Sequence, residues 1–72
     1  VKKPAGIEVI GDMLYVSDYE TGYIVAYNIT TGNEMGRLDT KKNKIMGLKA
    51  DSQGRLHFVA NGDNEIYRID PK

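Results

Sequence analysis

Two similar segments end in oxygen-bearing side chains, which are the first candidates for chemistry in this sequence. Asp18 ends LYVSD and Asn61 ends HFVAN, and hard cations prefer carboxylate and amide oxygens as ligands. The same side chains also accept hydrogen bonds from nearby backbone N–H groups and thereby fix turns. We favour this structural role, because a single shared site does not need a copy in each segment. We expect no metal site and no cofactor.

The residues that could support nucleophilic catalysis are few. The chain has no cysteine and one histidine, His57, which lies between apolar neighbours in RLHFVAN. A serine nucleophile needs a base within hydrogen-bond reach, and neither Ser17 nor Ser52 has a histidine or an acid at a recognisable spacing. We therefore expect no catalytic residue in this chain, and we expect His57 to pack between neighbouring sheets.

Charge and size narrow the function further. Ten Lys and Arg residues balance ten Asp and Glu residues, whereas nucleic acids and membrane surfaces are bound by clustered positive charge. The wholly apolar runs are too short for a membrane-spanning helix. Seventy-two residues without cysteine form at most one small domain with no disulfide to stabilise it. We expect no nucleic-acid partner and no membrane span, and we expect other subunits or further chain to supply stability.

The elements that must position these residues are strands. Runs rich in β-branched and aromatic residues alternate with Gly, Asn, Asp and Ser turns, which predicts an all-β chain. The expected strands are 7–10, 13–17, 23–28, 34–38, 47–50, 56–60 and 65–70. Gly32 and Gly54 close hairpins and should have positive φ. Asn28-Ile29-Thr30 matches a glycosylation sequon, but we expect Asn28 to cap its turn, and its glycosylation stays open.

The sequence also contains an internal repeat. Residues 4–29 align with residues 45–70, so that Tyr15 to Asp18 matches Phe58 to Asn61. Four antiparallel strands in a period of about 42 residues are typical of a β-propeller blade. We expect one full four-stranded blade at about 4–40 and a three-stranded second blade at about 45–72, which lacks its outer strand. A Greek-key sandwich is the alternative, but it does not require the repeat.

Three motifs make this pattern similar to a known family. Pro-x-Gly-Ile at 4–7, the segments LYVSD and HFVAN, and YNITTGNEMGRL resemble NHL-repeat and YVTN-repeat propellers of the six-bladed superfamily. The resemblance implies a partial propeller whose partner is the remainder of a longer chain or further copies of itself. Contacts would then involve the blade faces and the open edge of the third strand of blade two. We favour a piece of a longer propeller.

Blade topology predicts which loops share a face. Loops 1–5, 18–22, 39–44 and 61–64 should gather at one end, and loops 10–12, 28–33 and 51–54 with residues 71–72 at the other. The first end carries the weak candidates for ligand binding, which are Asp18, Tyr19, Asn61, Asp63, Lys41 and Lys42. Lys41, Lys42 and Lys44 join Lys2 and Lys3 there as a possible basic rim. We favour solvated loop charge, because acidic residues are expected beside them.

These observations lead to two functional hypotheses. The first is a non-catalytic scaffold or binding module that is extracellular, at the cell surface or periplasmic. The second follows from the resemblance, since some propellers of this superfamily are metal-dependent lyases or lactonases. In that case the chain is a fragment of a propeller enzyme whose catalytic residues lie in other blades.

Overall fold

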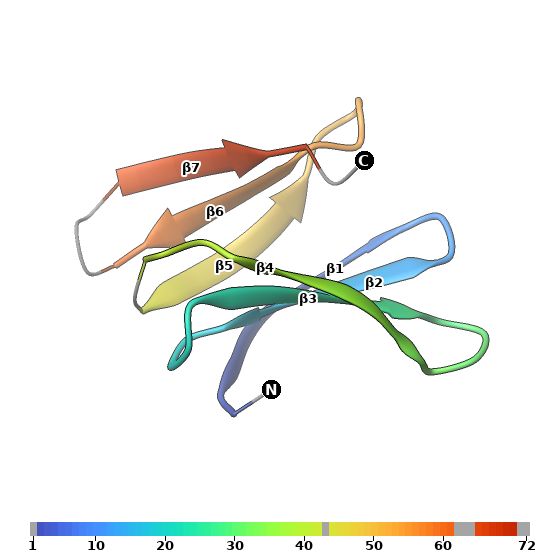
Figure 1. Ribbon diagram of the computed structural model, residues 1–72. Helices are drawn as coiled ribbons and strands as arrows, with labels where there is room; N and C mark the ends of the chain where they lie inside the picture. Colours follow the sequence, from blue (N-terminus) through green and yellow to red (C-terminus); the bar gives the residue numbers. More distant parts are fainter. Residues whose placement is uncertain (1, 43, 62–64, 71–72) are drawn as a thin grey trace.

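Two antiparallel β-sheets make up the structure. The computed structural model describes residues 2–42, 44–61 and 65–70, and these residues contain no helix (Figure 1). The first sheet has the order β1 (Pro4–Ile10), β2 (Met13–Asp18), β3 (Tyr23–Asn28), β4 (Glu34–Asp39). The second has the order β5 (Ile45–Ala50), β6 (Leu56–Ala60), β7 (Glu65–Ile69). The predicted all-β class and the counts of four and three strands are confirmed.

The turns form for the reasons that the sequence suggested. Gly32 and Gly54 both have a φ of 78°, a region that costs glycine little because it lacks a Cβ. The side-chain oxygen of Asn28 accepts hydrogen bonds from the backbone N–H groups of Thr30 at 2.9 Å and Thr31 at 3.0 Å. Both glycine predictions and the capping role of Asn28 are therefore confirmed.

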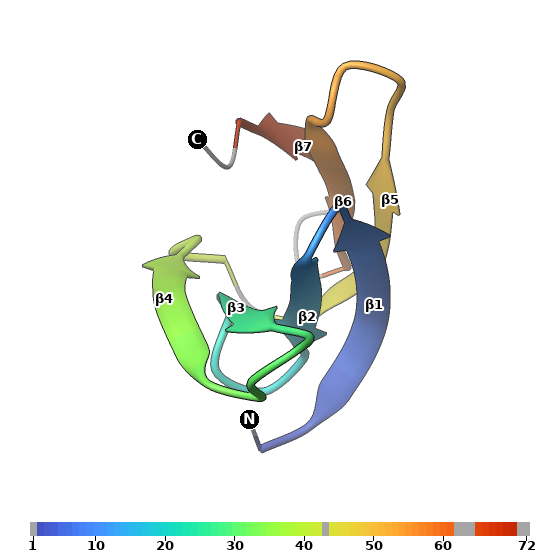
Figure 2. The same ribbon diagram turned by 90° about the vertical axis from the view of Figure 1, so that its right-hand side faces the viewer.

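The sheets pack against each other at β1, β2 and β5. Figure 2 shows β1 and β5 on the same side of the molecule, with β4 and β7 on the other side. Gly6 permits the close approach, since a Cβ at this position would lie 2.8 Å from the backbone nitrogen of Leu48. Buried apolar side chains fill the interface, and they include Tyr15, Ile24, Ile45, Leu48, Leu56 and Phe58.

The face of the first sheet that points away from the second sheet is apolar over β1, β2 and β3 and is most exposed at β1. We call it the Ile7 face; its two cross-strand rows are Ile7, Val16, Val25 and Val9, Leu14, Tyr27, and the ion-paired Arg37 and Glu34 of β4 end them. Ile7 is 64% exposed and Val9 is 51% exposed, whereas Val25 is 3% exposed. By contrast Leu48 and Phe58, which pair with each other as Ile7 pairs with Val16, are 4% and 3% exposed.

The loops at residues 2–5, 18–22, 39–42 and 44 gather with Asn61 at one end of the sheets, as predicted from the strand order, and we call this end the loop end. The backbone N–H of Tyr19 donates to Lys3 O at 2.8 Å, and that of Lys44 donates to Tyr19 O at 3.1 Å. The N–H of Asn61 in turn donates to Lys44 O at 3.0 Å. At the opposite end, the N–H of Ile29 donates to Asp12 O at 2.9 Å. The loop end is thus one hydrogen-bonded layer.

None of the described residues belongs to a helix with the length and apolar character needed to cross a bilayer.

Candidate binding surface

Asp18 is a structural residue of the loop end. Its side chain is 2% exposed, and its carboxylate accepts backbone hydrogen bonds from Lys2 at 2.8 Å, Lys3 at 3.2 Å, Glu20 at 3.0 Å and Thr21 at 3.3 Å. Burial raises the pKa of this carboxyl, but the hydrogen bonds outweigh burial and lower its pKa to about 2. The carboxylate therefore holds the N-terminal segment and the β2–β3 loop together.

Asn61 does not occupy the place of Asp18, so the predicted match between them is wrong. Asn61 donates its backbone N–H to Lys44 as Tyr19 does to Lys3, which makes Tyr19 its counterpart. A shift of one residue along a strand turns the side chain to the other face of the sheet. The two oxygen-bearing side chains are therefore not equivalent.

The remaining loop-end candidates are engaged separately. The Lys3 ammonium lies 5.7 Å from the ring centroid of Tyr19, and the Lys42 ammonium lies 4.7 Å from that of Tyr67. Lys41 has a φ of 59°, and its N–H donates to an Asp39 carboxylate oxygen at 2.9 Å. Asp63 lies outside the described residues. These contacts direct the ammonium groups of Lys3 and Lys42 to separate rings, which does not favour a single basic rim.

A cluster at the β5–β6 turn was missed by sequence reasoning. One Asp51 oxygen lies 2.7 Å from Arg55 Nε and 2.8 Å from His57 Nε2. The other accepts backbone N–H groups of Gln53 at 2.9 Å and Arg55 at 3.0 Å. The hydrogen bond from His57, with those from Arg55 and Gln53, holds the pKa of Asp51 well below its usual range. The sequence signal that could have revealed this cluster is the spacing of Asp51, Arg55 and His57, which a hairpin brings together.

His57 lies on the face of the second sheet that points away from the first sheet. Leu56 and Phe58 point into the core, so strand alternation turns His57 outward. It does not lie between the two sheets of this chain, so its packing between neighbouring sheets stays a prediction. A carboxylate–imidazole pair can position an imidazole for proton transfer, but this pair lies outside the cleft described next. Within residues 2–42, 44–61 and 65–70, no group of three or more acidic or histidine side chains is arranged to hold a metal.

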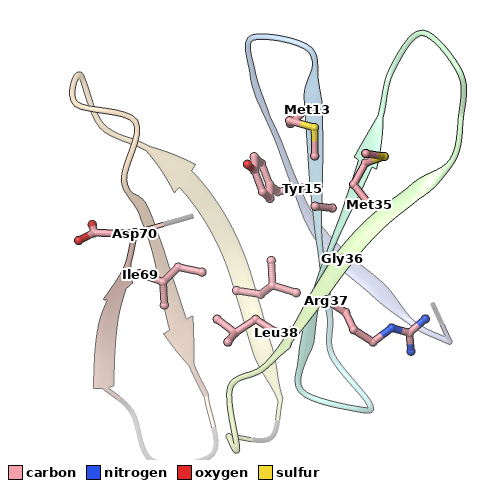
Figure 3. Close-up of a pocket in the computed structure, with 10 residues that line it drawn as sticks. Met13, Tyr15, Met35, Gly36, Arg37, Leu38, Ile69 and Asp70 are labelled. Atoms are coloured by element: carbon pink, nitrogen blue, oxygen red, sulfur yellow. The ribbon is translucent and has the colours of Figure 1, made fainter. Parts of the chain in front are cut away.

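An apolar cleft lies between the sheets where they diverge. It has a volume of about 320 Å³, and Met13, Tyr15, Met35, Leu38 and Ile69 line it. Gly36 lies in its wall, and Figure 3 shows the Arg37 side chain pointing away from the other lining side chains. A cleft with these walls suits apolar contact rather than acid–base chemistry.

The chain was compared with known proteins. No family model matches it, and no curated protein matches it.

Proposed function

We propose that this chain is a non-catalytic, propeller-type scaffold or binding module that works as part of a larger propeller or assembly. We place it outside the cell, at the cell surface or in the periplasm. The open Ile7 face carries the proposal, and the motifs at Pro4–Ile7 and in LYVSD support the propeller class.

The energetic reason is the exposed apolar surface. Burying an isoleucine or valine side chain fully is worth about 1.5–3 kcal/mol. Ile7 and Val9 lie side by side on β1, and each exposes half or more of its surface to water. Contiguous apolar patches of this kind mark interaction sites. The buried state of Leu48 and Phe58 indicates the type of cover that suits such a face, which is another β-sheet.

Cysteine labelling tests the proposal, because the chain contains no natural cysteine. The variants Ile7→Cys and Val9→Cys place a thiol on the Ile7 face, and Glu20→Cys places one on the exposed loop end. Alkylation rates are measured in extracts and medium of cells that produce the chain, and again after denaturation. We expect both face variants to react at least roughly tenfold more slowly than Glu20→Cys before denaturation. Equal rates would contradict the proposal.

A further inference from the structure

We propose that the partner on the Ile7 face is a second copy of this chain, which contributes the outward face of its β5–β7 sheet. We call that surface the Ile66 face; its rows are Met46, Val59, Ile66 and Lys49, His57, Arg68. This inference rests on the proposed function, because it identifies what covers the Ile7 face. The contact is head to tail, since each copy uses two different faces.

The apolar rows match in position. Counted from the loop end, the Ile7 face presents Ile7 and Val16 first, with Val9 and Leu14 behind them. The Ile66 face presents its apolar row first, with Ile66 at 74% exposed, and its basic row second. When the loop ends are aligned, the apolar row that contains Ile7 in one copy therefore meets the apolar row that contains Ile66 in the other.

The packing within one chain supplies the geometry. Leu48 and Phe58 correspond in pairing to Ile7 and Val16, and they pack against the inner row of the first sheet, which is Gly6, Ser17 and Ile24. The row that corresponds to this inner row in the second sheet is Met46, Val59 and Ile66. Repeating the same packing between two copies thus places Ile7 and Val16 on the apolar row of the Ile66 face.

Arg68 in the charged row also finds a partner. Within the chain, Ile69 faces Ala26 and Gly36 across the cleft. By strand pairing, Ile69 in the second sheet corresponds to Tyr27 in the first, and Ala26 in the first sheet corresponds to Arg68 in the second. Between two copies, Tyr27 of one chain and Arg68 of the next therefore bound the corresponding cleft. These side chains are larger than Ile69 and Ala26, and they fill it. Glu34 pairs with Tyr27 on this face, but its carboxylate already accepts hydrogen bonds from the Arg37 guanidinium at 2.8 and 2.7 Å. The group that Arg68 meets is therefore the Tyr27 ring.

A mixing experiment tests the head-to-tail contact. Ile7→Lys removes one face and Ile66→Lys removes the other, and both side chains are mostly exposed, so each variant should fold. Sedimentation velocity should show the wild-type chain as a species larger than 8.0 kDa and each variant alone as a monomer. An equimolar mixture should form a dimer, because each variant contributes its intact face to the other.

The outcomes separate this inference from other arrangements. A symmetric contact between two Ile7 faces would leave Ile66→Lys associated, and that result would overturn the inference. A monomeric wild-type chain, or a mixture that stays monomeric, would also overturn it. Circular dichroism confirms the fold of each variant, and Glu20→Lys, a charge change at the loop end, should retain the wild-type mass.

A double-mutant cycle tests the placement of Arg68. Tyr27→Leu or Arg68→Leu alone should weaken association roughly fivefold, and the double variant should weaken it by less than the two single effects combined, because both changes remove one shared contact. Additive effects would refute the placement. If Ile7→Cys is protected in cell extracts while the purified chain is monomeric, the proposed function stands and the second copy is wrong. If Ile7→Cys reacts freely in extracts too, both fail.

Discussion

Replacing Asp18 by asparagine should remove a pH-dependent part of the stability. The folded pKa is about 2, against about 3.9 for an unperturbed aspartate, and a difference of roughly two pKa units corresponds to about 2.5 kcal/mol. The side chain is almost fully buried, so solvent screens this contribution little. Because the folded pKa lies below the unfolded one, the contribution is complete above about pH 4 and is lost as the pH falls towards 2.

Urea unfolding followed by circular dichroism measures this contribution at fixed chain concentration between pH 2 and pH 7. The wild-type chain should exceed Asp18→Asn by about 2 kcal/mol in unfolding free energy at pH 7, and the difference should approach zero near pH 2. Asp12→Asn, in the exposed β1–β2 turn, is the matched control and should change little. A difference between wild type and Asp18→Asn that stays constant with pH would refute the reasoning.

Three further outcomes follow from backbone and turn geometry. Gly32→Ala and Gly54→Ala should each lower the unfolding free energy by about 1 kcal/mol or more in thermal melts, whereas Gly36→Ala, which has open space and no positive φ, should not. Gly6→Ala should cost about 1–3 kcal/mol by the same measurement, because its Cβ meets the backbone of the second sheet. Asp51→Asn should lower the urea midpoint at neutral pH and flatten its acid dependence, since a lowered pKa stabilises only above the usual aspartate range; an unchanged midpoint would contradict the role of its turn cluster.

The strands were predictable from local signals. Each strand lies between turn residues whose conformational needs are visible in the sequence, and the observed bounds differ from the expected ones by no more than three residues. Gly32, Gly54 and Asn28 were correctly assigned because each requirement depends on neighbours within a few positions. Local chemistry of this kind is carried by residue type alone.

The correspondence between the two sheets was not predictable to the residue. LYVSD and HFVAN have apolar side chains at both odd and even positions. Shifting their alignment by one residue therefore changes the matched residue types little. The actual register is fixed by backbone bonds to Lys3 and Lys44 and by irregularities between Pro4 and Gly6 and between Met46 and Leu48. The Asp51–His57 contact was missed for a related reason, since it depends on the hairpin bringing the two side chains to one face.

Burial across the first sheet indicates which side the proposed partner would cover. β2 has apolar side chains on both faces, and all six of its residues are buried or half-buried. β4, at the far edge, is exposed at every position. A sheet whose strand β2 is apolar on both faces and whose edge strand β4 is exposed is suited to being covered on both sides at β1 and β2. The second sheet covers one side there, and the uncovered side is the Ile7 face, so a partner that contacts β1 and β2 completes the packing.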